Sequence, residues 1–476
     1  MLINRSSPHV APNVKPIPSK HILVWLWVGL LLVRGCLYLF LVPPWQAPDE
    51  PTAIELLLTI QARGRLVSIA DKDPAIEHQI VEAMRRSRYW ALGGFAFTTA
   101  AREGQSFDDI YGPGNTQLHR PPLYQVSLLP IIWLTRGWPL EHQLMLLRAA
   151  NLVLGALTVV AAVLIGRQFA VVHPAIAFIL PAMVGLHPQF AYSSATFNAD
   201  NLATTLSAGA FLIMLWMTQQ GLAWRYVIAL VLLLVLGLWT KRTTLFIAPT
   251  VSIAMIMAAW RAKRPLWRRD KRWLTYGTTL LLLASGISIV LPQTNGWFRA
   301  SVEQYVLNTN LREYYRYITF GFARLDAPLL PTLWHIISFF NLSFWASYSW
   351  HSVNAPHWLA ATLLTCTLVT WCSACIYGVM AQRALPSWVR DYMALCVFAV
   401  ITTLLLIFVN RFPFGLIPGR YLFPAILPVL LFMALGLCCW WPQRWSVPGT
   451  TCALLALVTL DFYTIWSVVI PGFYHK

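Results

Sequence analysis

Charged residues are scarce in this 476-residue chain, because Asp, Glu, Lys and Arg fill only 11% of its positions whereas 58% are hydrophobic. An average soluble domain carries about 25% charged residues. Acidic residues are scarcer than basic ones, with 18 Asp and Glu against 35 Lys and Arg. This composition excludes an ordinary soluble enzyme and predicts a polytopic membrane protein.

Cysteine is also sparse, and its placement argues against a disulfide framework. All eight cysteines fall in or at the ends of apolar runs. Cys372 and Cys375 are therefore expected to be lipid-facing or packing thiols rather than a metal or redox pair. The net charge of +17 comes from Lys and Arg in short loops between apolar runs, a pattern that orients a membrane protein and does not indicate nucleic-acid binding.

Apolar runs of membrane-spanning length are abundant, and eleven transmembrane helices are expected. They lie at residues 22–42, 143–165, 175–192, 202–217, 226–239, 245–260, 273–291, 358–380, 392–409, 421–441 and 450–469. Segment 121–136 is marginal in length and contains Pro130, and segment 334–350 has aromatic residues throughout and is expected to be interfacial or re-entrant. If these two cross the bilayer, the count becomes 12 or 13.

The distribution of basic residues predicts the topology. Segment 261–272 carries seven Lys or Arg and one Asp, so it is expected in the cytoplasm, together with a disordered tail at residues 1–21. Two long loops, 43–120 and 292–356, then face outward, as does the C-terminus. The first holds ten of the 18 acids and two amphipathic helices, 52–63 and 74–88, expected to lie at the interface. The prediction is one all-α transmembrane domain at residues 22–476, in the plasma (inner) membrane.

Asp49 and Glu50 are the strongest candidates for a chemical centre, because they stand among four prolines directly after the first apolar run. The alternative is that they cap the following helix, since Pro-Asp-Glu-Pro is also a good helix start. With the topology above, Arg120, Asp200 and Arg420 lie on the same face of the membrane as Asp49.

Six short motifs follow one another between residues 22 and 469, and together they resemble the GT-C superfamily of membrane glycosyltransferases. Within it, the chain looks like an uncharacterised family of bacterial polytopic proteins. The motifs are Pro48-Asp49-Glu50-Pro51, His119-Arg120-Pro121-Pro122-Leu123-Tyr124, Leu147-Arg148-Ala149-Ala150, His187-Pro188-Gln189-Phe190 with Asn198-Ala199-Asp200, Ser343-Phe344-Trp345, and Gly419-Arg420-Tyr421-Leu422-Phe423-Pro424. That family usually has a His three residues after the Glu, where this chain has Ala53, so any donor contact made by that His is lost or replaced here.

The resemblance implies an inverting hexosyl- or pentosyltransferase of the cell envelope, for example in polysaccharide biosynthesis. It would move a sugar from a polyprenyl-phosphate or diphosphate donor to a hydroxyl of a glycan, lipid or protein acceptor, on the periplasmic or extracellular face. Asp49 would be the general base, with Glu50 positioning it or acting as a second acid. The remaining site residues would bind donor phosphate (Arg120, Arg420, Lys241, Arg242) or substrate (His119, Tyr124, His187, Asn198, Asp200, Tyr421).

Each of these residues also has a structural interpretation. The alternative for Arg120 is that it snorkels to the interface. Asp200 is in position for an N-cap, and the adjacent Lys241 and Arg242 suit interfacial anchoring. The histidines are often structural. No metal or other cofactor is expected, although some GT-C enzymes use a divalent cation.

Two other functions remain open. A transporter or flippase of lipid-linked sugars would have charges deep inside spans and internal repeats. No clear repeat is present, and Asp461 is the only acid well inside a late span. A polysaccharide polymerase or ligase would perform the same transfer to a different acceptor.

Overall fold

The computed structural model describes residues 20–92, 106–111, 116–261, 329–411 and 418–474, and this part of the chain is mostly helical. Eight of its helices are long and apolar enough to cross a membrane. They are α1 (Lys20–Leu41), α7 (Leu140–Phe169), α10 (Asp200–Gln220), η2 with α12 (Arg242–Phe246, Ile247–Arg261), α19 (His357–Met380), α20 (Ser387–Arg411), η3 with α21 (Gly419–Ala425, Ile426–Cys438) and α22 with η5 and α23 (Ser446–Thr464, Ile465–Val469, Ile470–Tyr474). The expectation of an all-α polytopic membrane protein is confirmed, whereas the count of eleven spans stays a prediction.

Four shorter apolar helices accompany them: α6 (Leu123–Leu134), α8 (Ile176–Gly185), α11 (Trp224–Thr240) and α17 (Leu329–Trp345). With 12 residues, α6 is about 18 Å long, which is shorter than the bilayer core, and whether segment 121–136 crosses stays a prediction. The expected span 273–291 and most of the loop 292–356 lie outside the described residues, as does most of the tail.

The expectation of one continuous helix over residues 175–192 is wrong. The helix breaks at His187, and a second helix, α9 (Pro188–Ser194), starts with proline at its first position. Proline has no N–H and is favoured at that position, where no intrahelical bond is lost. The Nδ1 atom of His187 accepts the N–H of Phe190 and so caps the new helix.

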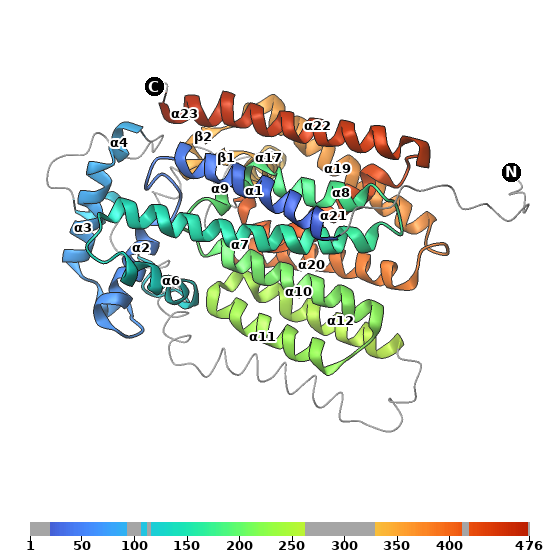
Figure 1. Ribbon diagram of the computed structural model, residues 1–476, viewed down its shortest axis with the longest axis horizontal. Helices are drawn as coiled ribbons and strands as arrows, with labels where there is room; N and C mark the ends of the chain where they lie inside the picture. The colour runs from blue at the N-terminus through green and yellow to red at the C-terminus, as the bar shows by residue number, and fades with distance from the viewer. Residues whose placement is uncertain (1–19, 93–105, 112–115, 262–328, 412–417, 475–476) are drawn as a thin grey trace, which may run out of the picture.

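Figure 1 shows the long helices side by side, with α2, α3, α4 and α6 gathered at one end of the bundle. The first polar loop forms five helical elements, which are α2 (Glu50–Arg63), η1 (Ile69–Asp71), α3 (Pro74–Arg86), α4 (Tyr89–Leu92) and α5 (Phe107–Tyr111). The last helix, α23, reaches the same end, where the hydroxyl of Tyr474 donates to the carbonyl of Leu41 at 3.0 Å. The first polar loop and the last helix therefore share one end of the bundle.

The first of the two expected interfacial helices is buried instead. Residues 50–60 of α2 are all buried, including the polar Glu55 and Thr59 along with Ile54 and Leu57. Apolar residues of α2, α3 and α6 form a second core that is separate from the core of the bundle. Only α3 has the amphipathic pattern expected, with Ile80 and other apolar residues inward.

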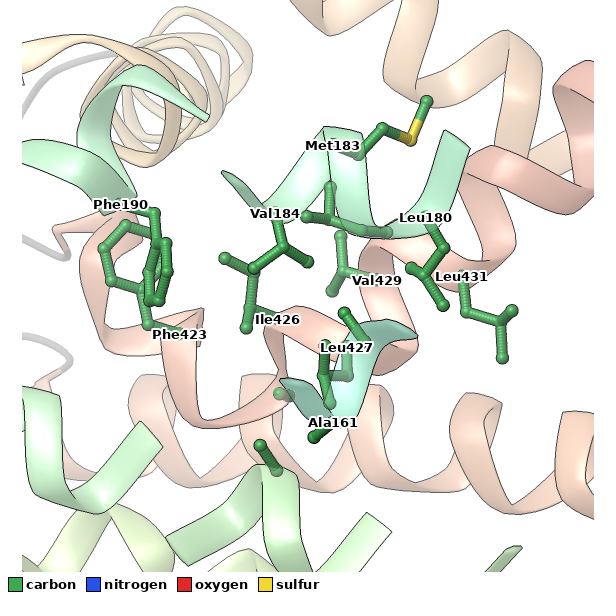
Figure 2. Packing of buried hydrophobic residues seen from close by; sticks show 14 of the residues in the cluster. Ala161, Leu180, Met183, Val184, Phe190, Phe423, Ile426, Leu427, Val429 and Leu431 are labelled. Atoms are coloured by element: carbon green, nitrogen blue, oxygen red, sulfur yellow. The ribbon is translucent and has the colours of Figure 1, made fainter. Parts of the chain in front are cut away.

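The main core runs through the bundle, and one part of it lies where α8 packs against α21. Figure 2 shows Leu180 and Val184 of α8 facing α21, with Val184 next to Ile426 and Leu180 next to Leu431. Close backbone contact joins α21 to α19, since a Cβ at Gly436 would lie 1.8 Å from the carbonyl oxygen of Thr370. Small residues at such contacts are typical of helix packing in membranes, where lipid is as apolar as the core.

Large apolar side chains cover much of the outer surface. Phe40 on α1, Met380 on α19 and Trp466 on η5 are each more than half exposed. A soluble protein rarely exposes so many, whereas lipid is their natural solvent. The outer surface thus agrees with a bundle embedded in a bilayer.

A short hairpin follows α17. It consists of β1 (Ser347–Tyr348) and β2 (Val353–Asn354), which pair antiparallel around a four-residue turn, α18 (Ser349–Ser352). We call residues 346–356 the hairpin loop. It packs between α9 and the start of the first polar loop.

Candidate functional site

Asp49 and Arg420 form an ion pair although they lie 371 positions apart in the sequence. The Arg420 Nη2 atom is 3.0 Å from the Asp49 Oδ2 atom. Asp49 stands just before α2 with a φ of 70°, and its side chain makes no capping hydrogen bond to that helix. A non-glycine residue in this left-handed conformation is uncommon and often marks a functional position. Asp49 is thus the N-cap residue of α2 by position, but its side chain bonds Arg420 and does not cap the helix.

Arg420 is held at the start of η3, directly after Pro418 and Gly419. Its Nε atom is buried and has no hydrogen-bond partner within the described chain. A Cβ at Gly419 would lie 2.1 Å from the carbonyl oxygen of Phe340, so the backbone of η3 can meet α17 only with glycine there. The guanidinium thus keeps one unused buried donor beside Asp49.

Glu50 belongs to a different and fully closed pair with Arg148 of α7. The two side chains are completely buried, and Arg148 Nε and Nη2 each donate to a Glu50 oxygen at 2.7 Å. Arg148 also donates to the carbonyls of Val42 and Pro43, and the N–H of Phe197 donates to Glu50. The expectation that Glu50 serves as a second acid does not fit, because these bonds occupy its carboxylate. Its role is to hold the loop that carries Asp49.

Asp200 pairs with Lys241, whose Nζ atom is 2.6 Å from Asp200 Oδ1. The same ammonium lies 5.3 Å from the centre of the Tyr421 ring, within range of a cation–π contact. Asn198 Oδ1 accepts the N–H of Asp200 at 2.9 Å, so Asn198 provides the local turn contact. Asp200 is the first residue of α10 and its side chain caps nothing, which contradicts the N-cap interpretation.

Arg120 and Arg242 lie close enough to act together on His119. Burial and the charges of these two guanidinium groups lower the pKa of His119 to about 4. Arg242 is exposed and Arg120 half-buried, and among the residues that the structure describes neither pairs with an acid. Two cations side by side without a counter-ion repel each other and favour a bound anion.

The structure brings most predicted residues to this end of the bundle, but two of them serve packing. Tyr124 is buried and donates to Asn151 Oδ1 at 3.0 Å. His187 is also buried, and its ring stacks on Trp345 with centroids 4.4 Å apart. The prediction that Tyr124 and His187 bind substrate is not supported by these positions.

Three residues of this region received no role from the sequence. Arg148 is one charge in a long apolar helix, and that isolation is the signal that could have identified its buried partner. His351, in the hairpin loop, interacts electrostatically with both Asp49 and Arg420. Glu55 of α2 is buried beside Thr116, which donates to its Oε2 atom, and burial raises the pKa of Glu55 to about 7.

No group of three or more His, Cys, Asp or Glu within the described ranges is arranged to hold a metal ion. The acids of the site are paired with Arg and Lys instead. No protein-family model, no curated protein and no solved structure matches the chain. Its function is therefore inferred from the residues of the site.

Proposed function

We propose that this protein is a membrane glycosyltransferase that uses a polyprenyl-phosphate- or diphosphate-linked sugar. One observation carries the proposal: a carboxylate held by an arginine, Asp49 with Arg420, lies at the same end of an apolar bundle as Arg120 and Arg242, two cations that pair with no acid in the described part of the chain. A lipid-linked donor needs this combination, with a base for the acceptor, cations for the phosphate and bilayer beside the site.

In the proposed reaction Asp49 takes the proton from the acceptor hydroxyl as its oxygen attacks the anomeric carbon. The bond from that carbon to the phosphate oxygen breaks, and its electron pair leaves with the phosphate. Such a base contributes about 10² to 10⁴ in rate. Attack opposite the leaving group inverts the configuration of the anomeric carbon.

The cations divide into two groups in this scheme. Arg420 orients Asp49 and offers its unused Nε–H to the substrate. Arg120 and Arg242 receive the donor phosphate, since guanidinium binds phosphate oxygens in a bidentate manner and these two have no competing acid in the described chain. Lys241 stays with Asp200 and lines the side of the site next to Tyr421. The charge of the leaving phosphate is thus balanced by protein side chains.

The proposal includes the outer face of the plasma membrane as the place of reaction. It rests on the basic segment 261–272, which orients the bundle so that the end carrying Asp49 faces outward. The proposal covers a glycan, lipid or protein hydroxyl as acceptor, and a polymerase or ligase differs from it only in that acceptor.

The test is transfer of label from polyprenyl-phosphate sugars to endogenous acceptors in membranes that contain the chain. Asp49→Asn should lower the rate at least about 100-fold at an unchanged protein level. Glu82→Gln is the matched control, because it removes an acid of the same loop that pairs only with Arg85 and His78 in the described structure. Transfer that survives in Asp49→Asn at the wild-type rate overturns the proposed base.

A transporter of lipid-linked sugars is the second candidate, and one observation favours it. Arg34 of α1 and Asp461 of α22 form a buried ion pair between two membrane helices. Charges in that position often mark a transport pathway. Movement of labelled lipid-linked sugar across vesicles without transfer to any acceptor is the result that would select this function.

A further inference from the structure

The hairpin loop is strained and held from several sides. Ser349 and His351 have φ values of 42° and 64°, both in the left-handed region that disfavours side chains. The N–H of Ser347 donates to Gln189 Oε1 at 2.8 Å, and the N–H of Ser349 donates to the hydroxyl of Tyr192 at 3.1 Å. Ser349 Oγ also reaches Gln46 Oε1, next to the Asp49 turn. Strain that surrounding contacts maintain in this way is characteristic of functional loops.

Three side chains of this loop form a closed ring of hydrogen bonds that determines the protonation of His351. Asn354 Nδ2 donates to the carbonyl of His351 at 2.7 Å, so Asn354 must turn its Oδ1 atom toward Ser347. Oδ1 can only accept a hydrogen bond, so the single O–H of Ser347 donates to Asn354 Oδ1, at 2.6 Å. Ser347 Oγ is then an acceptor for His351 Nδ1, 2.8 Å away. It follows that Nδ1 carries the proton and Nε2 has a free lone pair.

The bare Nε2 atom belongs to the site that holds Asp49. The charges of Asp49 and Arg420 both act on the His351 ring, and burial is the main reason that the pKa of His351 falls to about 3. Nε2 makes no hydrogen bond in the described part of the chain. It is also not one of the polar atoms there that are both fully buried and without a partner, so it is accessible. The ring is therefore neutral at physiological pH and presents an acceptor that a ligand can reach.

We propose that His351 Nε2 accepts a hydrogen bond from a sugar hydroxyl and so positions the substrate beside Asp49. The proposal rests on the proposed function and adds a binding residue to it. A neutral imidazole fixed in this tautomer recognises an O–H group and rejects a bare oxygen acceptor, so the ligand must present a hydroxyl there. Asp49 remains the group that takes the proton in the reaction.

The test uses His351→Asn in the full chain. Asparagine tolerates the left-handed backbone and can replace Nδ1 in the bond to Ser347, whereas nothing replaces Nε2. We expect a fall of roughly 3- to 10-fold in the maximal transfer rate at saturating donor, because the hydrogen bond that positions the hydroxyl beside Asp49 is lost. The donor KM should stay unchanged, because the proposed contacts to the donor phosphate are not altered. Ser347→Ala, which removes the lock on the tautomer, should also lower the maximal rate. His78→Asn is the control, since His78 is an exposed residue of α3.

A second measurement does not depend on activity. In the ¹⁵N spectrum of histidine-labelled wild-type protein in lipid, the resonances lost in His351→Asn should show a protonated Nδ1 and an unprotonated Nε2 up to at least pH 8. A protonated Nε2, or a maximal rate equal to wild type in a folded His351→Asn, overturns the proposal. If Asp49→Asn lowers transfer as expected and His351→Asn keeps the wild-type maximal rate, this inference fails alone. If wild-type membranes transfer no sugar, the proposed function fails, and the spectrum still decides the tautomer.

Discussion

Replacement of Glu50 by Gln should destabilise the protein more than any change to an exposed acid. The substitution keeps the size of the side chain and removes the charge that compensates Arg148. Both partners are completely buried, and Arg148 makes four hydrogen bonds in this place. In Glu50→Gln the Arg148 guanidinium still donates hydrogen bonds to the carbonyls of Val42 and Pro43, but its charge is no longer neutralised.

Removal of one partner from a buried ion pair costs about 3 to 5 kcal/mol, because the other charge stays buried without compensation. For a chain of this size we expect the midpoint of thermal unfolding to fall by about 5 °C. Glu141→Gln is the matched control, since Glu141 pairs with the exposed Arg86 at 2.7 Å. An exposed pair contributes about 0 to 1 kcal/mol, and its loss should shift the midpoint little.

The assay is thermal unfolding of the purified chain in detergent, followed by tryptophan fluorescence, with a double-mutant cycle. Glu50→Gln combined with Arg148→Met should be less destabilising than the two single changes added together, because the double variant leaves neither charge unpaired. Single effects that simply add, or a midpoint for Glu50→Gln equal to that of Glu141→Gln, would refute the structural role of Glu50 and return it to the candidates for catalysis.

Two further predictions concern the parts of the fold around the site. The pKa of Glu55 is raised from 4.5 to about 7, so the folded state favours the protonated carboxyl. The free energy of unfolding is therefore highest below pH 4.5 with respect to this group, and it falls as the pH rises through 7. Glu55→Gln should therefore be more stable than wild type by about 3 kcal/mol at pH 8 and by much less at pH 5, as measured by thermal unfolding at both values; an equal gain at both pH values contradicts it. Gly436→Ala should destabilise by about 1 to 3 kcal/mol because its Cβ would overlap the carbonyl oxygen of Thr370, whereas Gly29→Ala, with open space around it, should unfold like wild type.

The bounds of the long helices could be predicted because a long apolar run is a strong signal. The run 358–380 corresponds to α19, His357–Met380, and the run 22–42 to α1, Lys20–Leu41. Prediction failed where local chemistry interrupts a run, as at His187 and Pro188, because hydropathy does not register a missing N–H. It also failed for α2, whose burial depends on α3 and α6 packing around it.

That the charges of the site gather at one end of the bundle could be anticipated, but their partners could not. Counting spans places Asp49 and Arg420 on one face, and they do meet. Nothing local to Glu50 indicates that it pairs with Arg148 rather than facing the substrate, since the choice depends on how α7 crosses the loop. His351 was missed because its role follows from the closed ring with Ser347 and Asn354, which sequence spacing alone does not reveal.

Two of the buried ion pairs are closed, and closure indicates support rather than function. Arg34 Nε donates to Asp461 at 2.6 Å, a second nitrogen bonds the other carboxylate oxygen, and the third reaches the carbonyl of Gly185. The Glu50–Arg148 pair is completed by backbone carbonyls in the same way. A transported ligand would have to displace several charge-assisted bonds at once, so the charge inside the membrane is weak support for a transporter.

The other two pairs are open, and an open pair can exchange its partner for a ligand. Arg420 contacts Asp49 through one nitrogen and keeps a buried Nε–H unused. Lys241 meets Asp200 through one ammonium contact, and within the described chain neither oxygen of Asp200 accepts a further hydrogen bond. A bound phosphate or hydroxyl can complete these groups at little cost, because no satisfied hydrogen bond must first be broken. The difference between closed and open pairs therefore supports the proposal that the chemistry takes place at the end of the bundle where Asp49 lies, whereas the interior pairs hold the helices together.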